Sequence, residues 1–227
     1  MSVFSKLVPK QSCVLCAEPA EFCVCPSCQS ELETHQKRCK SCAIRLTTDL
    51  DFCGQCLAHA PTFRNSYTLF EYNAVCAELI KSFKFEYKLC VGDYLAHRLF
   101  VLYQTIPQEY DAIIPMPLSQ KRAKERGFNQ VLELLRSIRK NSNIMIDSHS
   151  VKRIKATQPL SLLSAEQRKK EIKGAFEVAS MPYKKVLLVD DVMTTGSSLN
   201  ELAKTILAQS NVKICDVMTL ARAETSF

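Results

Sequence analysis

The 227-residue sequence lacks tryptophan, contains only five glycines and has no long apolar run. No segment offers the roughly 18 consecutive apolar residues of a membrane-spanning helix, and the start, MSVFSKLVPKQS, has no apolar core after its basic residue. We therefore expect a cytoplasmic protein without membrane insertion. Aromatic residues make up 8% of the chain, so stacking platforms for nucleic-acid bases are not abundant.

The scarcity of glycine also excludes two common nucleotide-binding loops. No candidate strand is followed by G-x-G-x-x-G, which a dinucleotide-binding fingerprint requires. A Walker loop would need more glycine and a lysine directly before the Ser/Thr, and the TTGSS segment at 194–198 has one glycine and no lysine. Any phosphate site in this chain must be built differently.

Cysteine, by contrast, is abundant, and nine of the 12 cysteines lie between Cys13 and Cys56. In a reducing compartment such a cluster indicates metal binding rather than disulfides. Eight of the nine form C-x2-C pairs, a spacing that lets a tight turn direct both sulfurs at one ion. We predict two structural zinc sites formed by consecutive pairs, with a cross-braced pairing left open: Cys13, Cys16, Cys25 and Cys28, then Cys39, Cys42, Cys53 and Cys56.

The remaining cysteines and nearby histidines are not needed as ligands, because closed zinc sites use four each. We interpret Cys23, His35 and His59 as bystanders, and the three later cysteines as core residues: Cys76, Cys90 and Cys215. Residues 1–60 hold few large apolar side chains, so metal would supply much of their folding free energy. The predicted organisation is a double zinc ribbon at 1–60 and a larger domain at 61–227.

The first half of the larger domain alternates strand and helix patterns. Alternation at 66–73 predicts a strand, and a helix should follow with the face Val75, Leu79, Ile80 and Phe83. A second helix is indicated by Leu95, Leu99 and Leu102. The run DAIIPMPL predicts a strand that cannot continue beyond Ile114, because two prolines follow.

A basic loop then precedes a third helix. The loop carries Lys121, Arg122, Lys124 and Arg126 ahead of Gly127. Apolar residues at helical spacing predict one continuous helix after it, with the face Val131, Leu134, Leu135 and Ile138.

The last third predicts a βαβ unit with a ligand site at the end of its first strand. Val186 to Val189 form an unbroken apolar run, typical of a parallel strand buried on both faces. The chain should enter a loop at Asp190, and a helix should follow with Ser198 and Glu201 as a capping box. VKICDVMTL predicts the next strand, so 190–198 lies at the carboxyl end of the sheet.

This loop has the chemistry of a sugar-phosphate site. Small and hydroxyl residues at a helix N-terminus present free N–H groups and the positive end of the helix dipole to a phosphate. The adjacent carboxylates of Asp190 and Asp191 can accept hydrogen bonds from sugar hydroxyls. A ribose 5-phosphate fits both features.

The run VLLVDDVMTTGSS also looks like the signature of type I phosphoribosyltransferases, enzymes that use 5-phosphoribosyl 1-diphosphate and Mg²⁺. The resemblance implies an α/β fold with a parallel sheet flanked by helices, beside the small zinc-ribbon module. It implies that Asp190 and Asp191 are the catalytic residues and bind the ribose hydroxyls. The residues implied to cradle the 5-phosphate are Thr194, Thr195, Gly196, Ser197 and Ser198.

Along nearly the full chain, the cysteine pairs, PMPLSQKRAKERGFNQ, TQPLSLLSAEQRKKEIKGAF and the signature resemble the ComF/GntX family of competence-associated proteins. The resemblance implies a role in natural transformation, with proteins of the competence machinery as partners. It assigns the diphosphate to the segment Pro115, Met116, Pro117, Leu118 and Ser119. The approach to it would be lined by Lys121, Arg122, Arg126 and Gln130.

Charge supports a second hypothesis. The formal net charge is +7, and residues 120–174 alone carry 14 basic and five acidic residues, or +9. This stretch is either a solvated face or a surface for polyanions such as single-stranded DNA. Two functions follow: an Mg²⁺-dependent phosphoribosyltransferase with an unidentified acceptor, or a non-catalytic DNA-binding competence factor. In the first, 152–170 is the candidate lid, although Ser164 and Gln167 could cap a helix there.

Overall fold

The computed structural model of the chain describes residues 11–32, 36–86, 88–119, 124, 127–155 and 165–224. The strands are β1 (Gln11–Ser12), β2 (Pro19–Ala20), β3 (Ser66–Glu71), β4 (Ala112–Pro115), β5 (Met145–Ile146), β6 (Val151–Arg153), β7 (Phe176–Val178), β8 (Lys185–Met193) and β9 (Ile214–Arg222). The helices are α1 (Pro26–Leu32), α2 (Gly54–Ala58), α3 (Ala74–Phe85), α4 (Leu89–Thr105), α6 (Gln130–Leu134), α7 (Arg136–Asn141), α8 (Ala165–Ile172) and α9 (Ser197–Gln209).

A five-stranded parallel sheet forms the centre, in the order β3-β9-β8-β4-β5. The apolar run of β8 lies in the middle of it, and Val186, Leu187, Leu188 and Val189 are fully buried. Strand β9 pairs with β8 and is buried over nearly its whole length. The expected class, an α/β fold with a parallel sheet flanked by helices, is confirmed.

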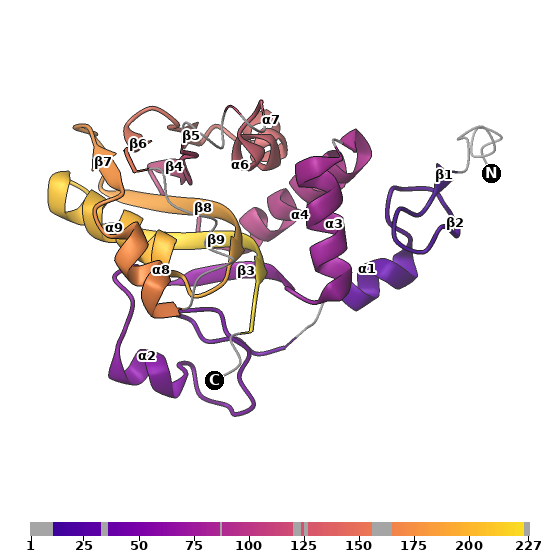
Figure 1. The fold of residues 1–227 in the computed structure, drawn as a ribbon, viewed down its shortest axis with the longest axis horizontal. Coiled ribbons are helices and arrows are strands. Elements are labelled where there is room, and N and C mark those ends of the chain that lie inside the picture. The colour runs from indigo at the N-terminus through magenta and orange to yellow at the C-terminus, as the bar shows by residue number, and fades with distance from the viewer. Residues whose placement is uncertain are drawn as a thin grey trace.

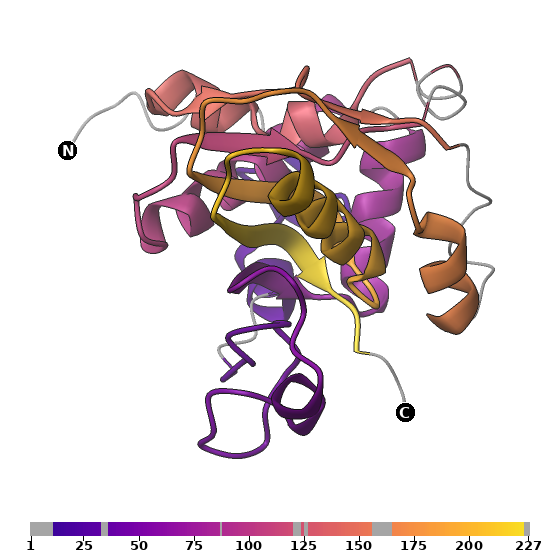
Figure 2. The ribbon, with the colours of Figure 1, turned by 90° about the vertical axis from the view of Figure 1, so that its left-hand side faces the viewer.

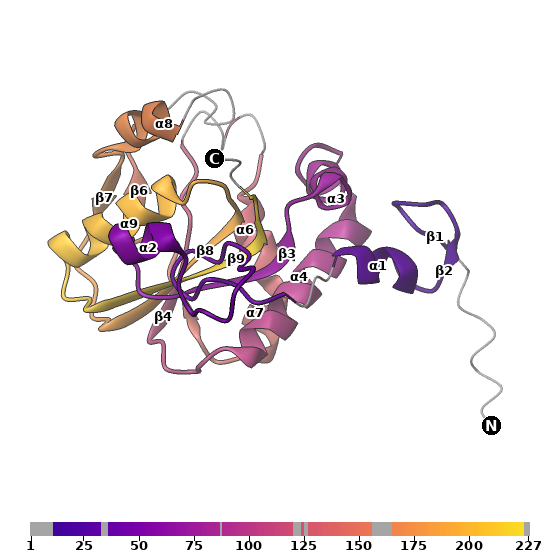
Figure 3. The ribbon, with the colours of Figure 1, turned by 90° about the horizontal axis from the view of Figure 1, so that it is seen from below.

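Helices cover both faces of the sheet (Figures 1 and 3). Helix α9 packs against β8 and β9, while α4 packs against β3 and β9 on the other side and also contacts α6 and α7. The predicted faces of α3 and α4 point inward, since Leu79, Ile80, Leu95 and Leu99 are buried. Strand β8, helix α9 and strand β9 form the expected βαβ unit.

Three local predictions are wrong. The chain does not leave β8 at Asp190, because β9 pairs with it as far as Met193, and both acids therefore belong to the strand. The helix expected at 131–138 is divided at Leu135 into α6 and α7, although its predicted apolar face is buried as expected. Cys90 is exposed at the start of α4, whereas Cys76 and Cys215 are buried as expected.

The candidate lid also differs from its prediction. Its first residues form β6, which pairs antiparallel with β7, so this part is a two-stranded ribbon rather than an irregular loop. The residues from 165 onward form α8, which lies beside α9 (Figure 2). Residues 156–164, including Ser164, lie outside the described residues. Nowhere in the described parts is a helix long and apolar enough to cross a membrane.

The cysteine-rich segment divides into two parts that lie apart. Residues 11–32 carry the β1–β2 hairpin and α1, which packs against α3 at one end of the molecule (Figure 1). The part with α2 lies below the end of β9 in Figure 2. It is hydrogen-bonded to the start of β3, where Ser66 donates from its hydroxyl to the Ser41 carbonyl at 2.6 Å.

Candidate functional site

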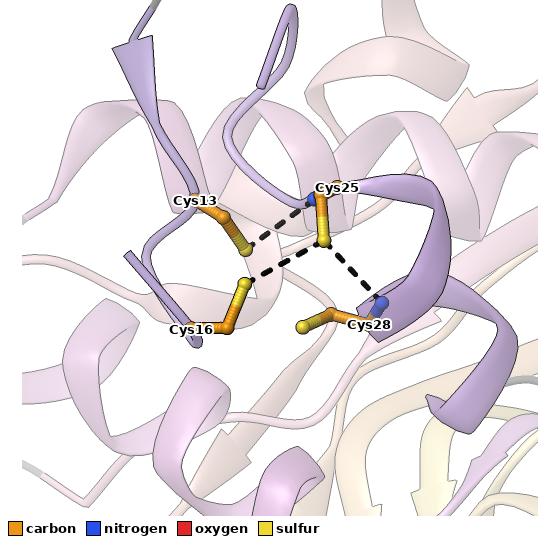
Figure 4. Close-up of side chains that lie close together, drawn as sticks. All are labelled: Cys13, Cys16, Cys25 and Cys28. Atoms are coloured by element: carbon orange, nitrogen blue, oxygen red, sulfur yellow. Dashed lines mark hydrogen bonds between the residues drawn. The ribbon is translucent and has the colours of Figure 1, made fainter. Parts of the chain in front are cut away.

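The first four-cysteine cluster is formed by two consecutive pairs, as predicted, and Figure 4 shows the four side chains converging. All four Sγ atoms lie within 4.8 Å of one another, and those of Cys16 and Cys25 are 3.7 Å apart. The Cys25 amide donates to Cys13 Sγ at 3.4 Å. A turn directs the first pair, because Ala17 has a left-handed φ of 63° and its amide donates to the Cys13 carbonyl.

The second cluster repeats this construction with Cys39, Cys42, Cys53 and Cys56. The Sγ atoms of Cys42 and Cys53 are 3.7 Å apart, and the Cys53 amide donates to Cys39 Sγ at 3.3 Å. The residue after Cys42, Ala43, has a left-handed φ of 55°, and its amide donates to the Cys39 carbonyl. The two sites therefore use the same turn at the same position.

Both clusters fit zinc. In a tetrahedral site with Zn–S bonds near 2.3 Å, two sulfurs are about 3.8 Å apart, which matches the short Sγ separations. Burial raises the pKa of the Cys13 thiol, but the backbone N–H groups of Cys25, Cys16 and Leu15 outweigh it and lower that pKa to about 6. The pKa of Cys39 is lowered in the same way. In each cluster, backbone N–H groups thus stabilise one thiolate.

The hydroxyl-rich loop lies between β8 and α9, at the carboxyl end of the sheet. Gly196 is the N-cap of α9 with a φ of 74°, a conformation that glycine adopts without strain. The hydroxyls of Thr195 and Ser197 are 2.8 Å apart, and Thr195 Oγ1 accepts from the Ser197 amide. The expected capping box is wrong, since Glu201 accepts from the Gly174 amide instead.

The two acids have different surroundings. Alternating burial from Asp190 to Met193 indicates that neighbouring side chains leave β8 on opposite faces. Asp191 Oδ2 accepts from Lys84 Nζ at 2.7 Å and from Gln130 Nε2 at 3.1 Å. Burial, and then the charge of Asp191, raises the pKa of Asp190 to about 7, against the opposing effect of Lys84 and Arg153.

The segment assigned to diphosphate lies beside the acids. Strand β4 ends at Pro115, which pairs with Val189, and the Met116 amide donates to the Val189 carbonyl at 2.7 Å. Met116 and Ser119 are buried, whereas Pro117 and Leu118 are partly buried. The structure thus brings 115–118, Asp190, Asp191 and 194–198 to one edge of the sheet. Lys121, Arg122 and Arg126 lie outside the described residues.

Sequence reasoning missed Lys84, which belongs to α3 and forms the ion pair with Asp191. One signal was present. Lys84 follows Ile80 by four residues and Phe83 by one, so it occupies the apolar face of the helix, where a lysine needs a partner. Arg153 was placed in a lid, but it is buried in β6 with its guanidinium 5.9 Å from the Phe176 ring centroid.

Comparison with known proteins identifies the family to which this chain belongs. No protein-family model matches the chain. Competence protein F of Haemophilus influenzae is 33% identical over 209 residues, which cover 88% of this chain and 90% of that protein. The chain belongs to the ComF family of competence proteins. DNA utilization protein YhgH of Escherichia coli K12 is 32% identical over 86% of this chain and 90% of its own length. Competence protein ComFC of Bacillus subtilis is 23% identical, and the match covers 88% of this chain and 78% of that protein.

Proposed function

We propose that this ComF-family protein binds 5-phosphoribosyl 1-diphosphate with Mg²⁺ and acts in natural competence, in the handling of incoming DNA. The observation that carries the proposal is the meeting of three segments at the carboxyl edge of the sheet: the loop 194–198, the acids of β8 and the segment 115–118. Ligand sites of open parallel sheets form at this edge.

Each of the three segments contacts a different part of the ligand. The 5-phosphate lies against the amides and hydroxyls of 194–198 at the start of α9. Asp190 and Asp191 accept hydrogen bonds from the ribose hydroxyls. A carboxylate offers about four acceptor positions, so the two contacts to Asp191 Oδ2 do not exhaust it. The diphosphate lies along 115–118, with Lys121, Arg122 and Arg126 supplying positive charge.

This arrangement suits transfer of the ribose phosphate. The bond from C1 to the diphosphate oxygen breaks, diphosphate leaves with the bonding electron pair, and an acceptor nucleophile forms the new bond to C1. Positive charge builds on the ribose ring during this step, and the carboxylates beside the ring stabilise it. When bound, Mg²⁺ supplies charge that offsets the departing diphosphate.

The proposed biological role is supported by the relatives. Competence protein F and DNA utilization protein YhgH align with nearly the whole chain, not with the phosphate loop alone. Similarity over 86–88% of this chain includes at least part of the cysteine segment as well as the sheet. We therefore assign the same field of action to this protein, natural competence and the use of external DNA.

Calorimetric titration of 5-phosphoribosyl 1-diphosphate with Mg²⁺ tests the ligand. Wild type should bind saturably, and the double variant Asp190→Ala/Asp191→Ala should bind at least about 100-fold more weakly, because several charge-assisted hydrogen bonds are lost. Asp111→Ala is the control, since Asp111 precedes β4 at the opposite end of the sheet and accepts from the Lys184 and Lys185 amides. Absence of saturable binding by wild type would refute the proposal.

A second candidate function is the binding of single-stranded DNA. It is favoured by exposed cations in the basic stretch, namely Arg136, Arg139, Lys140, Lys152, Lys155, Lys170 and Lys173. Binding through such side chains releases counterions from DNA, so the affinity should fall steeply as the salt concentration rises. An affinity for single-stranded DNA that does not change with salt concentration would exclude this surface.

A further inference from the structure

One arginine joins the second cysteine site to residues 194–198, the proposed phosphate-binding loop, called the phosphate loop below. Arg222, the last residue of β9, is only 4% exposed. Its Nε donates to the Cys42 carbonyl at 2.7 Å, and its Nη1 donates to the carbonyls of Met193 and Thr194. A single guanidinium therefore binds the turn that carries a cysteine of the second site and the first residues of the loop after β8.

A second connection lies on the other side of the loop. The chain that leaves the second site passes α9, where the Thr62 amide donates to Asn200 Oδ1 at 2.6 Å. The next residue, Phe63, is buried, and its ring approaches Gly196 so closely that a Cβ on that glycine would lie 3.9 Å from Phe63 Cζ. The loop 194–198 is thus held from β9 and from the cysteine segment together.

Geometry makes this connection sensitive to metal. Cys39 and Cys42, two ligands of the second site, belong to a turn in which the Ala43 amide donates to the Cys39 carbonyl. The Cys42 carbonyl, which accepts from Arg222 Nε at 2.7 Å, lies in the same turn. A metal ion that joins Cys39 and Cys42 to the other two thiolates holds this carbonyl in place, because metal binding at such a site supplies folding free energy. When the metal leaves, Arg222 loses a fixed partner.

The first cysteine site has different neighbours. Among the described residues, its hydrogen bonds run between residues of 11–32. Helix α1 contacts α3, and Cys23 lies near Cys90 of α4. The two sites therefore share their local structure but differ in what they support.

We infer that the second four-cysteine site is a metal-dependent support of the phosphate loop and that Arg222 is the positioning residue between them. Metal at Cys39, Cys42, Cys53 and Cys56 and an anion at 194–198 then stabilise each other, because energetic coupling between two sites is reciprocal. The identity of the anion rests on the proposed function, whereas the claim that the second site holds the loop 194–198 is independent of it.

Hydrogen exchange of the zinc-loaded, ligand-free protein tests the support. In Arg222→Met, the amides of 194–199 should exchange at least about tenfold faster than in wild type, the factor expected for one lost charge-assisted hydrogen bond. Arg222→Lys, which keeps the charge but loses the forked geometry, should give an intermediate rate. Arg139→Met is the control: it removes an exposed arginine in the last turn of α7, away from both cysteine sites, and should leave the loop unchanged.

Amides of α4, which lies in the core, report whether each variant is folded. The inference is overturned if Arg222→Met folds with wild-type exchange at 194–199, or if Arg139→Met changes the loop equally. Should Arg222→Met not fold, Arg222→Lys alone decides, and wild-type exchange in that variant overturns the inference as well.

Zinc release to a chelator tests the reciprocal direction. In wild type, 5-phosphoribosyl 1-diphosphate with Mg²⁺ should slow the release of one of the two zinc ions, and it should still do so in Cys16→Ser, which lacks the first site. Faster exchange in Arg222→Met without any effect of this ligand on zinc release would keep the support but refute the ligand. An equal effect of the ligand on both zinc ions would contradict the assignment to the second site.

Discussion

The two four-cysteine sites are alike within themselves and different in their surroundings. Each begins with a C-x2-C turn that ends in an alanine of positive φ, Ala17 in one and Ala43 in the other. Each has a pair of sulfurs 3.7 Å apart. Yet the first site belongs to a segment that packs on α3, whereas the second is hydrogen-bonded to Arg222 at the end of β9.

Two cysteine clusters with the same local structure can therefore support different parts of a protein, depending on the segments that each one contacts. The first site is linked to the candidate functional site through α3, the helix that carries Lys84 to Asp191. The second is linked directly to the loop 194–198, because Arg222 donates to the carbonyls of both Cys42 and Thr194. Four experiments test how far this contrast extends, beginning with the largest expected effect.

Cys16→Ser and Cys42→Ser remove the same position from each site. We expect each variant to hold one zinc ion and Cys42→Ser to lose about 5 kcal/mol of stability in the sheet domain, because structural zinc supplies folding free energy. Cys16→Ser should unfold residues 11–32 locally and shift the main transition little. Zinc content and thermal unfolding followed by circular dichroism measure both. Equal shifts of the melting temperature would break the contrast.

Lys84→Met tests the ion pair through which α3 contacts Asp191 in the candidate functional site. The change leaves the buried Asp191 carboxylate without its cation, and breaking such a pair costs about 3–5 kcal/mol. Chemical denaturation measures the loss. Adding Asp191→Asn should recover much of it, because the negative charge that faced Lys84 is then removed. A single variant as stable as wild type would mean that the 2.7 Å ion pair contributes nothing.

Asp190→Asn should alter how stability depends on pH. The pKa of Asp190 is raised to about 7 in the folded protein. Protonation therefore favours the folded state: this contribution is complete below about pH 4 and is lost as the pH rises through the folded pKa. The full shift corresponds to about 4 kcal/mol at pH 8, but Asp190 is only partly buried and water screens its charge. We therefore expect Asn to stabilise the protein by about 2 kcal/mol at pH 8 and by less than about 1 kcal/mol near pH 4.5. Melting temperatures of both proteins across this range check it, and a constant difference would contradict the raised pKa.

Ala17→Gly and Ala43→Gly compare the two turns directly. Both alanines have left-handed backbones, a conformation that costs an L residue about 1 kcal/mol and glycine much less. Each change should therefore slow zinc release from its own site by several-fold, offset in part by the greater flexibility of glycine in the unfolded chain. If zinc release slows in only one of the two variants, the two turns are not equivalent.

Much of the fold could be predicted because the relevant patterns are local. The apolar run of β8 and the spacings in α3, α4 and α9 depend only on which side chains are apolar, and these elements are present. The failures arise where a distant segment decides. Pairing with β9 continues β8 past Asp190. Glu201 accepts a hydrogen bond from the Gly174 amide and therefore does not form the capping box. Cys90 lies on the exposed side of α4.

Ligand spacing and apolar periodicity are properties of short stretches, so the amino-acid sequence was enough to predict the two cysteine clusters, the parallel sheet and the segments that meet at its carboxyl edge. The pairing of Asp191 with Lys84, and the hydrogen bonds by which Arg222 joins Cys42 to Thr194, became visible in the folded protein, since these partners are 107 and 180 residues apart in the chain. Such contacts form between side chains that folding brings together, and no local pattern records them.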